Sequence, residues 1–251
     1  MRFFLKTLVS AAILLLAATI LTAQSSESRT NDESAEVQVS TSEGGSSVSH
    51  MEQKSGWYTS PDQGHPVCSE KPEPTCSPSV DGNSARFSIR PTGPFDNCLC
   101  PIKRGKSKTA THFTLEVRYR LSDPSVSQGV EFSSNKHGGT NGYKFSVQCS
   151  YNKGIFSVCN TAGRHWTPTN IPCTRPARDT RDQLTVPTEI RDGKAVFHSL
   201  TLNRETHEIN QSFDPLTKET AYSFGVHFQK NGNKQGNPDY VWLDNFKFTV
   251  W

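Results

Sequence analysis

Several polar side chains fall at every second position of short segments whose intervening residues are apolar. Guanidinium, ammonium and amide groups hold hydroxyls and anions, and a histidine can also move protons. The polar side chains at these alternating positions are Glu116, Arg118, Arg120, Lys144, Gln148, His227 and Gln229. Gathered on one face, they would form a groove for a polar, anionic polymer. The alternative is that they form the ordinary solvated face of a half-buried sheet.

Trp166 is the aromatic residue that fits such a groove. It follows the turn Gly163-Arg164-His165 and precedes Thr167-Pro168. A flat aromatic face in a loop can stack on a sugar ring while its polar edge stays in water. The same side chain could instead cover the core beside Cys173, so both roles remain open.

Strands must position these residues, because the dominant period of the chain is two. In the segment from His112 to Leu121, apolar Phe113, Leu115 and Val117 alternate with polar residues, which is typical of a half-buried strand. Further segments of this kind cover residues 143–149, 155–158, 195–203, 206–210, 222–228 and 240–250. No long segment has a helical period. We therefore expect an all-β protein, an antiparallel two-sheet β-sandwich or jelly roll.

The N-terminus has the pattern of a secretory signal. Arg2 and Lys6 precede an apolar run from Thr7 to Ile20, which is shorter than the roughly 20 residues that span a bilayer. We expect cleavage after Ala23, so residues 1–23 form a signal peptide rather than a membrane anchor. The Ser/Glu-rich residues 24–54 are expected to be a disordered linker, and residues 55–251 the folded domain. The mature protein is then secreted, extracellular or periplasmic, with no membrane span.

All seven cysteines follow the predicted signal, which favours disulfides in an exported domain. Cys98 and Cys100 are too close for a zinc knuckle and for an unstrained mutual bridge. The odd number of cysteines leaves one thiol over. The net charge of +3 is nearly balanced and does not indicate a nucleic-acid-binding protein. No feature of the sequence indicates an oligomeric state.

Three stretches carry a family resemblance: residues 142–151 (GYKFSVQCSY), 166–173 (WTPTNIPC) and 240–251 (YVWLDNFKFTVW). Together they resemble a group of largely uncharacterised secreted bacterial proteins with the concanavalin A-like lectin/glucanase fold. The resemblance covers roughly residues 129–251. It implies a jelly roll with a concave sheet across which a carbohydrate polymer lies.

The same resemblance implies a disulfide between Cys149 and Cys173, which would stabilise the fold by about 3 kcal/mol through loop closure. Cys159 stands where similar proteins carry a tryptophan, so it is the candidate for the odd thiol. It is either buried and reduced or reactive. Cys68 and Cys76, across a proline-rich loop, are the next expected pair.

The resemblance raises two enzymatic alternatives. Retaining glucanases of this fold place two carboxylates on one face of a strand. Here Glu131 is followed by Ser133 and Asn135 where acidic partners would stand, so this activity is not expected. Polysaccharide lyases of this fold use arginine, glutamine and histidine, for which Arg118, Gln148 and His227 are the candidates. The Gln-[Ile/Val]-His and Tyr-x-Lys-x-Gly-x-Tyr strings of such lyases are absent.

No cofactor or metal is expected. Calcium has only weak support from Asp239, Asp244 and Asn245, which do not form a spaced cluster of three carboxylates. The favoured hypothesis is a secreted, lectin-like, non-catalytic domain that contacts a glycan. The alternatives are a polysaccharide lyase or other glycan-active enzyme, and a structural cell-surface protein.

Overall fold

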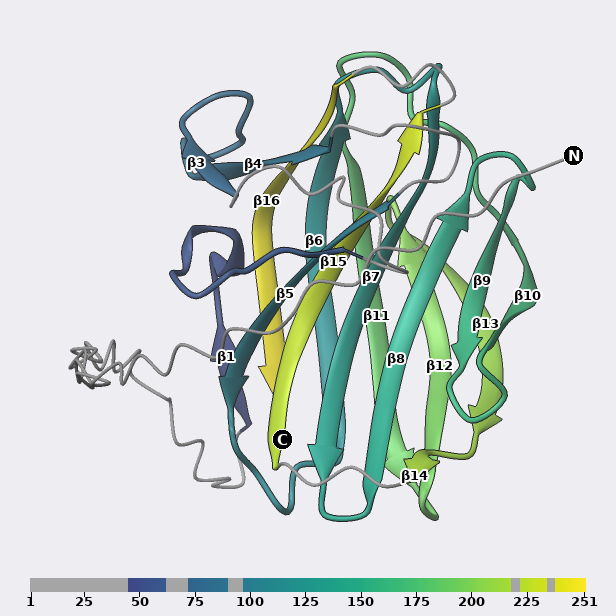
Figure 1. Ribbon diagram of the computed structural model, residues 1–251. Coiled ribbons are helices and arrows are strands. Elements are labelled where there is room, and N and C mark those ends of the chain that lie inside the picture. The colour runs from purple at the N-terminus through teal and green to yellow at the C-terminus, as the bar shows by residue number, and fades with distance from the viewer. Residues whose placement is uncertain (1–44, 62–71, 90–96, 218–221, 234–237) are drawn as a thin grey trace, which may run out of the picture. The chain divides into compact units, whose positions relative to one another are not determined.

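Two antiparallel sheets make up the part of the chain that the computed structural model describes, residues 45–61, 72–89, 97–217, 222–233 and 238–251 (Figure 1). Sheet A has the order β13 (Glu205–Phe213), β12 (Lys194–Leu202), β11 (Asp182–Arg191), β6 (His112–Leu121), β16 (Asp239–Val250), β4 (Ser84–Ile89) and β3 (Glu73–Thr75). A short strand, β1 (Ser46–Val48), pairs with β16.

Sheet B carries the strands that position the candidate site. Its order is β10 (His165–Pro172), β9 (Ile155–Asn160), β8 (Asn141–Ser150), β7 (Ser127–Gly138), β15 (Ser223–Asn233), β5 (Asn97–Gly105) and β2 (Ser60–Pro61), with β14 (Leu216–Thr217) against β8. Strands that are neighbours in sheet B are often far apart in sequence, as β7 and β15 are. The predicted antiparallel β-sandwich is confirmed.

Aromatic side chains from both sheets fill the space between them. The ring centroids of Tyr119 on β6 and Phe132 on β7 lie 5.3 Å apart, and those of Phe87 on β4 and Phe228 on β15 lie 5.2 Å apart. Both distances fall in the range at which aromatic pairs attract beyond simple burial. The inner faces of the sheets therefore form one core, and the remaining side chains of each strand point outward.

The period-two pattern predicted the strands that are buried on one face only. The segment from His112 to Leu121 is β6, with the predicted bounds and strict alternation of buried and half-buried residues. The pattern missed β7, because its first eight residues are buried on both faces and show no alternation. It also missed β11, where Pro187 lies at a register shift against β12.

The folded domain begins before the predicted boundary at residue 55. β1 pairs with β16, and a 3₁₀ turn, η1 (Met51–Gln53), places the fully buried Met51 in the core. The indole of Trp57 donates to the Met51 carbonyl at 2.9 Å, and the Glu52 carboxylate accepts from the Phe246 amide at 3.0 Å. Residues 45–54 are thus part of the fold and not of a linker. Residues 1–44, with the predicted signal, lie outside the described residues.

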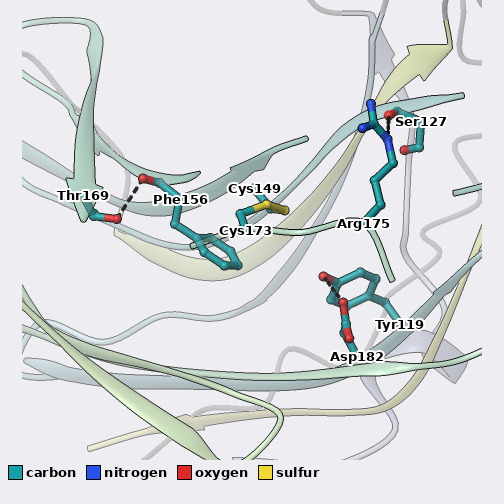
Figure 2. The surroundings of a disulfide bond; sticks show 8 residues. All are labelled: Tyr119, Ser127, Cys149, Phe156, Thr169, Cys173, Arg175 and Asp182. Carbon is teal, nitrogen blue, oxygen red and sulfur yellow. Dashed lines mark hydrogen bonds between the residues drawn. A yellow bond between two sulfur atoms is a disulfide. The ribbon is translucent and has the colours of Figure 1, made fainter. Parts of the chain in front are cut away.

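The expected disulfide between Cys149 and Cys173 is present and ties the end of β8 to the segment after β10 (Figure 2). Cys98 also takes part in a disulfide. The expected pairing of Cys68 with Cys76 is wrong, since Cys76 is free and exposed; Cys68 lies outside the described residues. Cys159 is free, as expected, but Cys100 and Cys76 are free as well.

No helix among the described residues has the length and apolar composition to cross a membrane.

Candidate functional site

The eight predicted ligand-binding residues divide between the two sheets, so the single groove that they were expected to form does not exist. Glu116, Arg118 and Arg120 lie on β6 in sheet A, where the inward positions are held by Val117 and Tyr119. The others belong to sheet B: Lys144 and Gln148 on β8, His227 and Gln229 on β15, and Trp166 on β10.

This division corrects the lyase hypothesis in its original form. Arg118 lies on the outer face of sheet A, whereas Gln148 and His227 lie on strands of sheet B. A uronate held by Arg118 could not reach His227 through the aromatic core. The three residues therefore do not converge on one substrate.

Two of the sheet A residues form ion pairs on the surface of the protein. The Lys247 ammonium lies 3.1 Å from the Glu116 carboxylate. Arg120 pairs with Asp179, and its guanidinium lies 5.7 Å from the centre of the Trp242 ring. Both side chains thus have local partners that explain their position.

The outer face of sheet B brings polar residues together across its three central strands. In the register of these strands, Glu131 on β7 lies between Gln229 and Gln148. Two rows further along the same face, Asn135 of β7 is the neighbour of Lys144. Glu131 was not among the predicted ligand-binding residues, because β7 lacked the alternation that would have placed it on the same face as His227.

A buried network of hydrogen bonds centres on His227 and Glu131. The Nε2 of His227 lies 3.0 Å from Oε1 of Glu131, and the Lys144 ammonium lies 3.3 Å from the same oxygen. The other ring nitrogen, Nδ1, lies 3.1 Å from Nδ2 of Asn135. Because the amide donates to Nδ1, the proton of the neutral ring lies on Nε2 and is donated to the carboxylate.

The network keeps Glu131 ionised. Burial by itself raises the pKa of this carboxyl, but the hydrogen bond from His227 and the charge of Lys144 outweigh it and lower the pKa to about 2. The side chains of Glu131 and His227 are only 2% and 6% exposed. A carboxylate with this pKa holds no proton at neutral pH, so it is a fixed negative charge and not a proton donor.

A pocket of about 320 Å³ adjoins this network. We call it the tryptophan pocket; it is lined by Lys144, Cys159, Thr161, Arg164, His165, Trp166 and Leu216. The Lys144 side chain is 35% exposed and belongs both to the pocket and to the Glu131 network. Its ammonium lies 6.0 Å from the centre of the Trp166 ring. Trp166 is half-buried and lines this pocket.

Cys159 lies beside Trp166 in the register of β9 and β10. Burial is the main influence on its thiol and raises the pKa. A thiol with a raised pKa stays protonated and is a poor nucleophile. Cys159 therefore contributes apolar surface to the tryptophan pocket.

The two glutamines lie in the same row as Glu131 and do not line the pocket. Gln229 is buried, and its amide donates to Oδ1 of Asn231 at 3.0 Å. Gln148 is half-buried between Glu131 and Ser157 in the register. Within the described ranges, no group of three or more His, Cys, Asp or Glu residues is arranged to hold a metal ion.

Comparison with solved structures identifies the fold. Arcelin-5, a lectin-like defence protein from Phaseolus vulgaris, superposes with a TM-score of 0.50 at 9% identity, over 82% of this chain and 98% of arcelin-5. The chain has the concanavalin A-like lectin/glucanase fold. The resemblance expected from the sequence is thereby confirmed at the level of the fold.

Two further solved structures resemble the chain. The cellulose-induced protein Cip1 gives a TM-score of 0.49 at 12% identity, over 77% of this chain and 90% of Cip1. An alginate lyase variant in complex with an alginate trisaccharide gives 0.46 at 11% identity, over 78% and 97% of the two chains. No protein-family model matches the sequence, and no curated protein matches it.

Proposed function

We propose that the protein binds an anionic glycan, without converting it, through the tryptophan pocket on the outer face of sheet B. The observation that carries this proposal is the placement of Lys144 beside Trp166 in one pocket. An aromatic ring supplies the flat apolar surface on which a sugar ring stacks, and the ammonium supplies a partner for a carboxylate or sulfate.

The charge of the pocket lining supports an anionic ligand. Lys144 and Arg164 are cationic, and none of the seven lining residues is a carboxylate. Arg164 is exposed at the rim, where its guanidinium is free to take up a bidentate anion. Glu131 does not line the pocket, and its carboxylate already contacts His227 and Lys144.

The state of His227 supports binding rather than catalysis. A general base must reach the proton that it abstracts, but His227 is buried and both of its ring nitrogens are engaged by Glu131 and Asn135. Glu131 is held ionised, and no carboxylate lines the tryptophan pocket. The pair of carboxylic groups that retaining glycoside hydrolysis needs is therefore not assembled there.

The proposal includes secretion. The disulfide between Cys149 and Cys173 is of a kind that persists in oxidising compartments. The basic and apolar residues 1–23 have the composition of an export signal. A glycan-binding domain outside the cytoplasm agrees with both features.

Calorimetric titration of the protein with polygalacturonate, and with hydroxyethylcellulose as a neutral polymer, tests the proposal. We expect binding to polygalacturonate that weakens as salt is added. Trp166→Ala should weaken it about tenfold, through loss of the stacking surface. Arg164→Ala should weaken it less and reduce the salt dependence. Lys153→Ala, which removes a cation from an exposed turn outside the pocket, is the matched control.

Three outcomes would contradict the proposal. If Trp166→Ala binds polygalacturonate with unchanged affinity, the polymer does not bind at the tryptophan pocket. Equal binding of the neutral polymer would remove the role of charge. A rise in ultraviolet absorbance from unsaturated uronate product, abolished by His227→Ala, would show that the protein is a lyase.

A further inference from the structure

A second pocket lies on sheet A, outside the site described above. It has a volume of about 210 Å³, and we call it the arginine pocket; it is lined by Arg118, Arg181, Asp182, Gln183, Asn203 and Arg204. Arg118 comes from the middle of β6, Gln183 is its neighbour on β11, and Arg204 comes from the turn between β12 and β13. Two strands, the residue that precedes β11 and one turn thus bring three arginines to the lining of one pocket.

Two of these guanidinium groups lack an acidic partner. Among the residues that the structure describes, neither Arg118 nor Arg204 has a carboxylate within salt-bridge distance. Other arginines of the protein do have such partners, in the pairs Arg86–Glu73, Arg120–Asp179 and Arg191–Glu189. The pocket therefore holds positive charge that the protein itself does not neutralise.

Asp182 and Asp244, two carboxylates near the arginine pocket, already have partners. Asp182 accepts hydrogen bonds from the Tyr119 hydroxyl at 3.1 Å (Figure 2) and from the Asn203 amide at 2.8 Å. Asp244 accepts from the Val80 amide at 2.6 Å and lies 3.9 Å from Nε of Arg181. These carboxylates neutralise part of the positive charge of Arg181. They do not pair with the guanidinium groups of Arg118 and Arg204.

The backbone of the turn supplies independent evidence for a role of Arg204. Asn203 and Arg204 have φ values of 51° and 77°. Tight hairpin turns with two such residues favour Asn-Gly, because glycine alone adopts the second conformation without steric cost. Asn203 is anchored, since its Oδ1 accepts from the Gln183 amide at 2.8 Å. Arginine at a position where glycine would be more stable indicates that the arginine side chain has a functional role.

We propose that the arginine pocket binds an oxyanion, the carboxylate or sulfate group of one unit of an acidic polymer. Guanidinium groups hold such anions by paired, charge-assisted hydrogen bonds. The volume of the pocket is smaller than the 300 Å³ or more that is typical of whole-ligand sites, so it suits a single group and not a whole oligosaccharide. The amide side chains of Gln183 and Asn203 add polar surface to its wall.

Arg204→Gly provides a sharp test, because glycine relieves the backbone strain while the substitution removes the cation. Calorimetric titration would use dextran sulfate, polygalacturonate and inorganic sulfate in turn. We expect Arg204→Gly and Arg118→Gln each to weaken binding of at least one of the polymers about fivefold or more. Arg178→Ala, which removes a cation from an exposed position outside the pocket, should change the affinity much less. The melting temperature of Arg204→Gly should equal or exceed that of the unchanged protein.

Several results would overturn the inference. If Arg204→Gly and Arg118→Gln bind every probe as Arg178→Ala does, the arginine pocket is not a binding site. If only inorganic sulfate responds to these substitutions, the pocket takes a free ion and not a polymer group. If Trp166→Ala abolishes polymer binding and Arg204→Gly has no effect, the tryptophan pocket alone binds the polymer. Loss of polymer binding in Arg204→Gly with full binding in Lys153→Ala would support the inference whatever Trp166 does.

Discussion

Glu131 shows how much the role of one residue depends on its neighbours. In the sequence it is a lone carboxylate, which excluded one form of hydrolysis and suggested nothing further. In the structure it is buried and held by His227 and Lys144, which come from two different strands. Its charge holds the ammonium of Lys144, which lines the tryptophan pocket, so Glu131 is a positioning residue.

The lowered pKa of Glu131 predicts a dependence of stability on pH. Its pKa falls from 4.5 to about 2 on folding. A group with a depressed pKa stabilises the fold fully above its unfolded pKa, and this contribution is lost as the pH falls toward the folded pKa. The free energy of unfolding should therefore decrease between pH 4.5 and about 2, as measured by urea denaturation at each pH.

Glu131→Gln should remove this part of the pH dependence and lower the stability at neutral pH by about 2 kcal/mol or more, since it breaks a buried ion pair. Glu208→Gln, at an exposed position, serves as the control and should leave both quantities nearly unchanged. Parallel pH profiles for Glu131→Gln and the unchanged protein would contradict the role assigned to the network.

At the scale of elements, the disulfide holds β8 to the segment that follows the edge strand β10. β9 and β10 form the edge of sheet B and carry Cys159 and Trp166, two of the residues that line the tryptophan pocket. Because an edge strand has a neighbour on one side only, a covalent link close to its end limits its motion. The disulfide thus supports the pocket as well as the fold.

Replacing both Cys149 and Cys173 by serine should lower the free energy of unfolding by about 3 kcal/mol, as expected for a loop of this length. The bridge spans a sequence separation of 24 residues. Guanidinium denaturation measures the loss, with Cys76→Ser at a free, exposed cysteine as the control. If the double variant and the control unfold at the same denaturant concentration, the bridge does not contribute to stability.

At the scale of the whole molecule, the two pockets lie on different sheets, each outside the aromatic core. The tryptophan pocket belongs to β8, β9, β10 and β14 of sheet B, and the arginine pocket to β6, β11 and the β12–β13 turn. A protein that binds an acidic polymer on both sides would link two polymer chains or two parts of one polymer chain.

The segment from β1 to η1 completes sheet A and its core.

The role of that segment predicts the outcome of a truncation. A chain that begins at Ser55 lacks β1 and Met51, which is fully buried, whereas a chain that begins at Gly45 retains both. The shorter chain should be less stable by about 3 kcal/mol or more, because it loses a buried methionine and a strand. Thermal unfolding followed by circular dichroism compares the two. Equal melting temperatures would show that the folded domain begins at residue 55, as the sequence predicted.

The candidate site could be predicted only in part, for a reason that its strands make clear. Lys144, His227 and Trp166 were found from alternation and residue type, and the structure places all three on sheet B. Glu131 was missed because both faces of the first part of β7 are buried. Glu116, Arg118 and Arg120 follow the same alternation, but alternation does not specify to which sheet a strand belongs.

The sequence by itself determined the all-β class, the bounds of β6 and the disulfide that the family resemblance implied, because each depends on local periodicity or on a recognisable motif. Only the tertiary structure decided which strands are neighbours. β6 pairs with β11 and β16, whereas β7 pairs with β8 and β15. Strand pairing joins residues far apart along the chain and is chosen by the packing of the whole core. Because of this pairing, Arg118 and His227 lie on different sheets, whereas His227 and Glu131 lie on neighbouring strands of sheet B.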